Sequence, residues 1–151
     1  MTETDSARAL IEQLELAPHP EGGWYRETWR GEADETGRAN GTAILFLLTA
    51  DQRSHWHTVD AAELWFWQSG DPLDLRIAES DDGPVRTIRL GSGDQWQGLI
   101  PTGAWQAAEP ATPHENAAGY TLVSCVVVPG FEFSGFRLAA PDWSPGKDAA
   151  A

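Results

Sequence analysis

The strongest constraint on the fold is a run of short, strand-like segments along most of the chain. About nine of them recur at roughly ten-residue spacing, separated by clusters of Gly, Pro, Asn and Asp. They are WYRETWR, TAILFLLTA, AELWFWQSG, LDLRIAE, VRTIRLG, WQGLIPTG, WQAAEP, YTLVSCVVVPG and FEFSGFRLA. Because no second long helical pattern accompanies them, they predict an all-β antiparallel sandwich or barrel.

A single helical pattern lies at the N-terminus. Residues 5–16, DSARALIEQLEL, place apolar residues on one helical face after an Asp/Ser start, which predicts one short amphipathic helix. The length of 151 residues predicts a single domain over residues 1–151, with a core at about 9–140 and a C-terminal tail at 141–151. We expect the tail to be poorly packed apart from Trp143.

Charge and targeting signals narrow the partners. The formal net charge is −13, with 23 acidic residues against 10 Lys and Arg, so nucleic acids and anionic membranes are unlikely partners by charge. No secretory signal or long apolar stretch is present, and the one cysteine, Cys125, lies among apolar residues. We therefore expect a cytoplasmic protein with a buried, inert thiol.

The stretch HWHTVDAAELWFWQSG, residues 55–70, is the main candidate for chemistry. In an extended strand His55 and His57 point the same way, and a hairpin turn after them would bring Glu63 beside both. Two histidines and one carboxylate are ligands for non-haem iron and other divalent metals such as Mn, Ni or Zn. A histidine pair on a strand is more often structural, so both interpretations stay open.

A second candidate is HPEGGWYRE, residues 19–27. The paired glycines at 22 and 23 favour a bulge or bend, and the polar residues after them could simply pair across strands. Alternatively, one alternating set reaches a cavity and binds a polar ligand. The candidate ligand-binding residues here are Glu21, Tyr25 and Glu27, or Arg26 on the other face, where an arginine would suit a carboxylate or phosphate.

The tryptophans allow two interpretations. Trp65, Trp67 and Trp105 either fill the interior or form a stacking wall for a sugar or aromatic ring. Trp56, between the two histidines, should point away from them. His114 lies in a predicted loop, where we expect a solvated side chain rather than a catalytic one.

Residues 100–109, IPTGAWQAAE, complete a recognisable pattern. The order His-x-His, Glu63, Gly70 resembles the first motif of the cupin superfamily. The order Pro101, Gly103, Gln106 resembles its second motif, with glutamine where the family has a metal-binding histidine. The stretches LAPHPEGGWYRETWR, AILFLLT, ELWFWQSGDPL, PTGAWQAAE and TLVSCVVVPGFEFSGFRLA look like a little-characterised cupin subfamily catalogued as a domain of unknown function.

This resemblance implies a single-domain jelly-roll β-barrel, a homodimer, and a ligand-sized cavity in each barrel. It leaves the reaction open. One interpretation is an isomerase, epimerase or lyase acting on a sugar-like or carboxylate-bearing metabolite, with His57 as base, Glu63 as its partner and Tyr25 as acid.

Two alternatives stand beside it. One is a metal-dependent oxygenase or lyase that uses His55, His57, Glu63 and Gln106 as ligands, and Gln106 could equally bind substrate. The other is a non-catalytic carrier or sensor of a small molecule.

Overall fold

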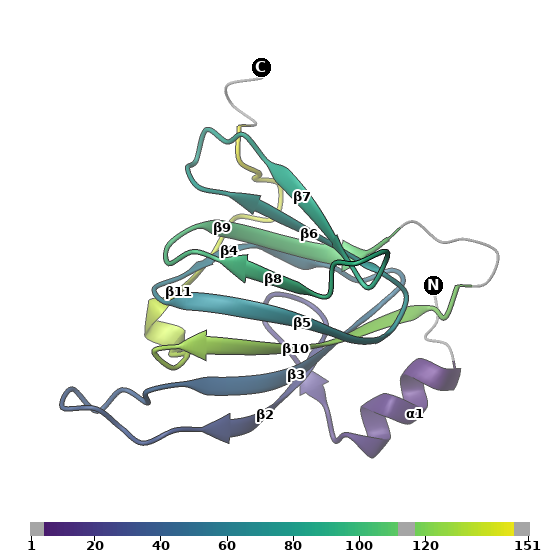
Figure 1. Ribbon diagram of the computed structural model, residues 1–151, viewed down its shortest axis with the longest axis horizontal. Coiled ribbons are helices and arrows are strands. Elements are labelled where there is room, and N and C mark those ends of the chain that lie inside the picture. Colours follow the sequence, from purple (N-terminus) through teal and green to yellow (C-terminus); the bar gives the residue numbers. More distant parts are fainter. Residues whose placement is uncertain (1–4, 112–116, 147–151) are drawn as a thin grey trace.

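The computed structural model describes residues 5–111 and 117–146, which form two antiparallel sheets and a short N-terminal helix (Figure 1). The strand orders are β1-β2-β3-β10-β5-β8 and β11-β4-β9-β6-β7. The strands are β1 (Ala17–Pro18), β2 (Trp24–Arg30), β3 (Thr42–Thr49), β4 (Ser54–Val59), β5 (Ala62–Gly70), β6 (Leu73–Ala78), β7 (Arg86–Leu90), β8 (Gln97–Ile100), β9 (Trp105–Pro110), β10 (Tyr120–Val128) and β11 (Phe136–Leu138). The prediction of an all-β jelly roll is confirmed.

The helix α1 (Asp5–Gln13) is shorter than the segment predicted for it. It ends early because the chain turns at Glu15, whose φ of 56° lies in the left-handed region, and the Leu16 N–H bonds back to Ile11. Leu10 and Leu14 pack against Leu16 and the buried Leu47. The helix thus covers one end of the six-stranded sheet.

The main core lies between the two sheets. Phe46, Trp65 and Val123 of the six-stranded sheet meet Leu75 and Ile77 of the five-stranded sheet, and all five are almost fully buried. The alternation of apolar residues in the strand-like segments places these side chains inward, as expected for sheets with one buried face.

A second cluster lies on the other side of β4 and β9. Trp56 and Trp105 pack there with Ala78, and Trp143 covers Trp105 at a ring distance of 4.4 Å. Trp56 therefore points away from the interior, as expected. Trp143, the exception expected in the C-terminal tail, thus holds the last segment of the described chain against β9.

No helix within residues 5–111 and 117–146 has the length and apolar character needed to cross a membrane. His114 belongs to residues 112–116, outside the described part of the chain.

Candidate functional site

A cavity of about 430 Å³ opens at one end of the interior, lined from both sheets and from the segment after β10. Its inner wall carries four acid–base side chains and one thiol: His19, Glu21, His57, Glu63 and Cys125. Its more exposed rim includes Tyr25, Glu27, Arg30, Phe131, Glu132 and Phe133. The two segments predicted to carry chemistry, residues 19–27 and 55–70, therefore meet at one site.

His55 and His57 do not face the same side of β4. Ser54 pairs with Ala108 and His57 with Gln106. Between these two pairs β4 moves along by three residues and β9 by two, so β4 contains one extra residue. This β-bulge shifts the alternation by one residue. His57 lines the cavity, whereas His55 lies outside it, with Nε2 2.8 Å from the Ala140 carbonyl oxygen. The expected parallel orientation of the pair is wrong.

Glu63 reaches the cavity by a different route from the one predicted. The turn after His57 is not a hairpin, because β4 belongs to the five-stranded sheet and β5 to the six-stranded sheet. The chain crosses between the sheets, and the two side chains face the cavity from opposite layers.

The ring of His57 is buried, apart from the part that lines the cavity, and is held in one tautomer. Its Nδ1 lies 2.7 Å from the backbone oxygen of His55, an acceptor only, so Nδ1 carries the proton and donates. The pKa of His57 is lowered to about 4, chiefly by burial; the hydrogen bond to the His55 backbone oxygen opposes this shift, and the electrostatic effect of the nearby His55 ring adds to it. The imidazole is therefore neutral at physiological pH.

Glu63 ends a buried chain of hydrogen bonds. Trp65 donates from Nε1 to Oε1 of Gln106 at 2.8 Å, and Gln106 donates from Nε2 to Oε1 of Glu63 at 2.9 Å. Since an indole nitrogen can only donate, the orientation of the amide is fixed. Gln106 thus positions Glu63 from behind and does not line the cavity.

The carboxyl group of Glu63 titrates far from its usual range. Burial raises its pKa to about 7, although hydrogen bonds from Gln106 and Cys125 oppose the shift. The same burial, with the charges of Glu63 and Glu21 nearby, raises the pKa of the Cys125 thiol well above its usual value. The thiol is buried as expected, but it faces the cavity.

Glu21 is the second buried carboxyl group of the wall. Its Oε2 accepts a hydrogen bond from Ser54, and its Oε1 lies 3.3 Å from Nδ1 of His19. That Nδ1 also accepts the backbone N–H of Glu21 at 3.1 Å, so it is the unprotonated nitrogen of the ring. Burial, and then the charge of Glu63, raise the pKa of Glu21 well above its usual value. Glu21 therefore holds a proton more tightly than an ordinary carboxyl group.

The turn before β2 places Glu21 by close backbone packing. Gly22 has a φ of 111°, and a Cβ there would lie 2.0 Å from the backbone oxygen of Arg53. Only glycine combines that conformation with such an approach. The paired glycines therefore form a sharp bend, and they position the carboxyl group beside Ser54.

On β2, the alternation predicted from the sequence holds for the first residues and then breaks. Tyr25 and Glu27 line the cavity, and Arg26 points outward to Glu15 at 3.5 Å. A register shift against β3 between Glu27 and Trp29 then brings Arg30 to the cavity side. The arginine at the cavity is thus Arg30, which alternation alone did not identify.

The three tryptophans proposed as a stacking wall lie elsewhere. Trp65 and Trp67 pack within the main core, and Trp105 belongs to the cluster on the other side of β9. None of them lines the cavity. The aromatic rings that do are Tyr25, Phe131 and Phe133, of which the two phenylalanines come from the PGFEF stretch. His19 was also missed, although it stands two residues before Glu21.

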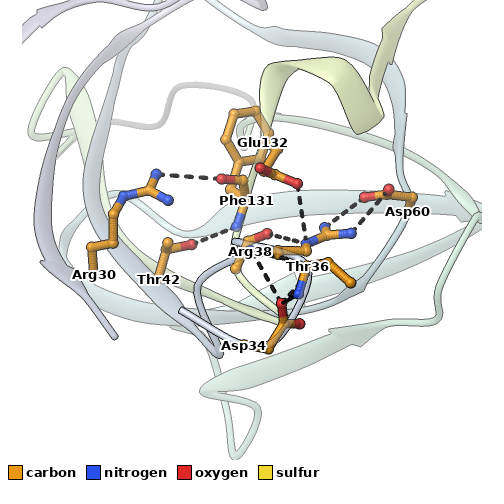
Figure 2. A network of polar contacts seen from close by, with 9 residues as sticks. Arg30, Asp34, Thr36, Arg38, Thr42, Asp60, Phe131 and Glu132 are labelled. Carbon is orange, nitrogen blue, oxygen red and sulfur yellow. Dashed lines mark hydrogen bonds and ion pairs between the residues drawn. The ribbon is translucent and has the colours of Figure 1, made fainter. Parts of the chain in front are cut away.

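The rim segment after β10 is fixed by two arginines (Figure 2). Arg38 donates to the Gly130 backbone oxygen at 2.8 Å and to both carboxylate oxygens of Asp60, at 2.7 and 3.1 Å. Arg30 donates to the Phe131 oxygen at 3.3 Å and forms two hydrogen bonds with Glu27, at 2.7 and 3.2 Å. The rim is therefore tied to both β2 and the β4–β5 connection.

The four predicted metal ligands do not fit a metal ion. His55 lies outside the cavity, and the Gln106 oxygen already accepts the Trp65 N–H. Across residues 5–111 and 117–146, no group of three His, Cys, Asp or Glu side chains is arranged to hold one.

Two antiparallel sheets that enclose a cavity with acid–base groups define a jelly roll of the cupin class. The family model described as "Cupin superfamily (DUF985)" matches residues 8–139, so the chain belongs to that cupin family. The resemblance seen in the sequence is confirmed.

Relatives of similar length support the assignment. A hypothetical protein from Leishmania major superposes with a TM-score of 0.79 at 34% identity, over 89% of this chain and 87% of that one. Protein SO0799 from Shewanella oneidensis gives 0.79 at 33%, over 93% and 86%. The uncharacterised protein YML079W of Saccharomyces cerevisiae is 28% identical, over 85% of this chain and 72% of its own length.

A Bacillus subtilis oxalate decarboxylase variant shares the fold alone. It has a TM-score of 0.60 at 16% identity, over 81% of this chain and 29% of its own.

Proposed function

We propose that the protein is a proton-transfer enzyme, an isomerase or epimerase, that acts beside a carbonyl group of a small sugar-like metabolite in the cavity. The observation that carries the proposal is the buried carboxyl group of Glu63, facing the cavity with a pKa of about 7. A base is most effective when its pKa lies near the working pH.

The proposal assigns the base to Glu63 rather than to His57, the base expected from the sequence. An imidazole with a pKa of about 4 is a weak base but a good neutral hydrogen-bonding group. Glu63 removes a proton from the carbon beside the carbonyl, and the C–H electron pair forms a C=C bond. The carbonyl oxygen then takes up a proton and becomes the hydroxyl of an enediol.

Proton donors face the same space. Glu21 binds a proton more tightly than an ordinary carboxyl group because its pKa is raised, and Tyr25 also lines the cavity. Return of a proton to the same carbon gives the epimer, and return to the neighbouring carbon gives the isomer. Two carboxyl groups with raised pKa values in one cavity suit the acid and base roles of such a cycle.

The experiment is solvent hydrogen exchange. The protein is incubated in D2O with four- to six-carbon aldoses and ketoses, and loss of the carbon-bound hydrogen beside the carbonyl is followed by proton NMR. We expect exchange with at least one sugar and its loss, by about 100-fold or more, in Glu63→Gln. Glu15→Gln, at the exposed partner of Arg26, is the matched control and should exchange like wild type.

Equal exchange in Glu63→Gln and wild type would refute the role of Glu63. Tight binding of a sugar that never exchanges its hydrogens would instead indicate the carrier or sensor alternative.

A further inference from the structure

His19 and His57 present opposite nitrogen chemistry to the cavity. Nδ1 of His57 donates to the backbone oxygen of His55, which leaves Nε2 as the unprotonated acceptor. Nδ1 of His19 accepts the backbone N–H of Glu21, which leaves Nε2 as the N–H donor. Each tautomer is fixed by a hydrogen bond between the ring Nδ1 and a backbone group two residues away. Because the pKa of each ring is about 4, both rings are neutral and keep these opposite tautomers near pH 7.

Both Nε2 atoms are open to the cavity. Neither atom has a hydrogen-bond partner in the described chain. Among the described residues, the side-chain polar atom that is both inaccessible and without a partner is Trp24 Nε1. The two histidine nitrogens, which also lack partners, are therefore accessible from the cavity. Both rings line the cavity and both contact Phe136, at ring distances of 6.1 Å for His19 and 5.3 Å for His57. A donor and an acceptor are thus offered to a ligand from neighbouring positions.

The charges of the lining do not suit an anionic ligand. Four carboxyl groups line the cavity: Glu21, Glu27, Glu63 and Glu132. Among the described lining residues the one cation is Arg30, and Glu27 already binds its guanidinium through two hydrogen bonds. A phosphate or carboxylate ligand would therefore lose its hydration without gaining a cationic side chain to pair with. The resulting desolvation free energy strongly disfavours binding of an anion in a buried site.

We propose that the cavity recognises an uncharged α-hydroxycarbonyl group, with His19 Nε2–H donating to the carbonyl oxygen and His57 Nε2 accepting the neighbouring hydroxyl. The inference rests on the proposed function, because it names the substrate class of the same site. It excludes sugar phosphates, nucleotide sugars and sugar acids, and it gives His19 the position from which an N–H polarises the carbonyl for proton removal.

Three four-carbon probes test this recognition: erythrulose, which has the α-hydroxycarbonyl group, erythritol, in which the carbonyl is reduced, and erythronate, which is anionic. Binding is followed by NMR titration of nitrogen-15-labelled histidines. We expect erythrulose to bind at least about tenfold more tightly than erythritol, and erythronate not to bind. Binding of erythrulose should shift the Nε2 resonances of both His19 and His57. In the free protein, the nitrogen-15 shifts should report opposite tautomers for the two rings.

Variants locate the contacts. His19→Gln and His57→Gln should each weaken erythrulose binding by about tenfold, whereas His55→Gln, on the same strand but outside the cavity, should leave it unchanged. If a buried variant fails to fold, the tautomers and the three-probe comparison in wild type decide. Identical tautomers, preferred binding of erythronate, or no binding of erythrulose would overturn the inference.

The two proposals fail in different ways. Erythrulose that binds as expected while no sugar exchanges its hydrogens would contradict the proton transfer alone. Exchange that persists unchanged in His19→Gln and His57→Gln would contradict the recognition alone.

Discussion

Glu63 and Gln106 share a buried hydrogen bond, with Nε2 of Gln106 donating to Oε1 of Glu63 at 2.9 Å. The bond joins the two sheets, because Glu63 lies on β5 and Gln106 on β9. It also explains why a glutamine suits this position: its amide serves the Trp65 N–H on one side and the carboxyl group on the other.

Replacing that amide should destabilise the fold. Gln106→Leu leaves the Trp65 N–H and one oxygen of Glu63 without partners in the core, so we expect a loss of about 1–3 kcal/mol in the free energy of unfolding. Urea denaturation measures it. Gln68→Leu, at an exposed position, is the control and should change stability by less than about 0.5 kcal/mol. Equal stability of the two variants would contradict the role of the hydrogen-bond chain.

Stability should depend on pH through Glu63. Its pKa rises from 4.5 to about 7 on folding, so the folded chain binds this proton more tightly, and stability from this group is lost as pH rises through that window. Glu63→Gln removes the effect. Relative to wild type, the variant should gain up to about 3 kcal/mol between pH 4.5 and 7.5, measured by denaturation at each pH. A constant difference between the two proteins would refute the raised pKa.

The turn at Gly22 should tolerate no side chain. Gly22→Ala places a Cβ against the Arg53 oxygen in a backbone conformation unfavourable for alanine, and we expect a loss of at least about 2 kcal/mol. Gly37→Ala separates the two effects, because Gly37 has a φ of 90° but no atom near its Cβ position. Thermal unfolding should show a clearly smaller loss for Gly37→Ala. Comparable losses would mean that the close approach to Arg53 is unimportant.

Metal binding should not depend on the histidine pair. Because His55 and His57 face different sides of β4, we expect untagged protein equilibrated with Mn²⁺ or Zn²⁺ and then desalted to hold the same amount of metal in wild type, His55→Ala and His57→Ala. Elemental analysis gives the ratio. One ion per chain that is lost in both variants would contradict the observed geometry.

Much of the fold could be predicted from the sequence. The segments WYRETWR, AELWFWQSG and WQAAEP coincide with β2, β5 and β9, because Gly, Pro and polar turn residues bound each of these runs. The two-residue strand β1 is too short to carry any pattern. The homodimer expected from the family resemblance stays a prediction.

The site was predicted only in part, and two of the errors share one cause. Glu21, Tyr25, Glu27, His57 and Glu63 do face one cavity, as a strict two-residue alternation around each motif suggests. His55 was misplaced and Arg30 was missed, and each lies at or just after a register shift in its strand. A β-bulge inserts one residue and reverses the faces beyond it, and it leaves no clear mark in a single sequence.

The central claim is that burial turns Glu63 into a base poised near neutrality and keeps His57 uncharged. A residue-specific NMR pH titration, with carbon-13 in the glutamate carboxyl groups and nitrogen-15 in the histidine rings, tests it directly. We predict a pKa of about 7 for Glu63 and about 4 for His57. Ordinary values, near 4.5 for Glu63 and 6.5 for His57, would contradict the account.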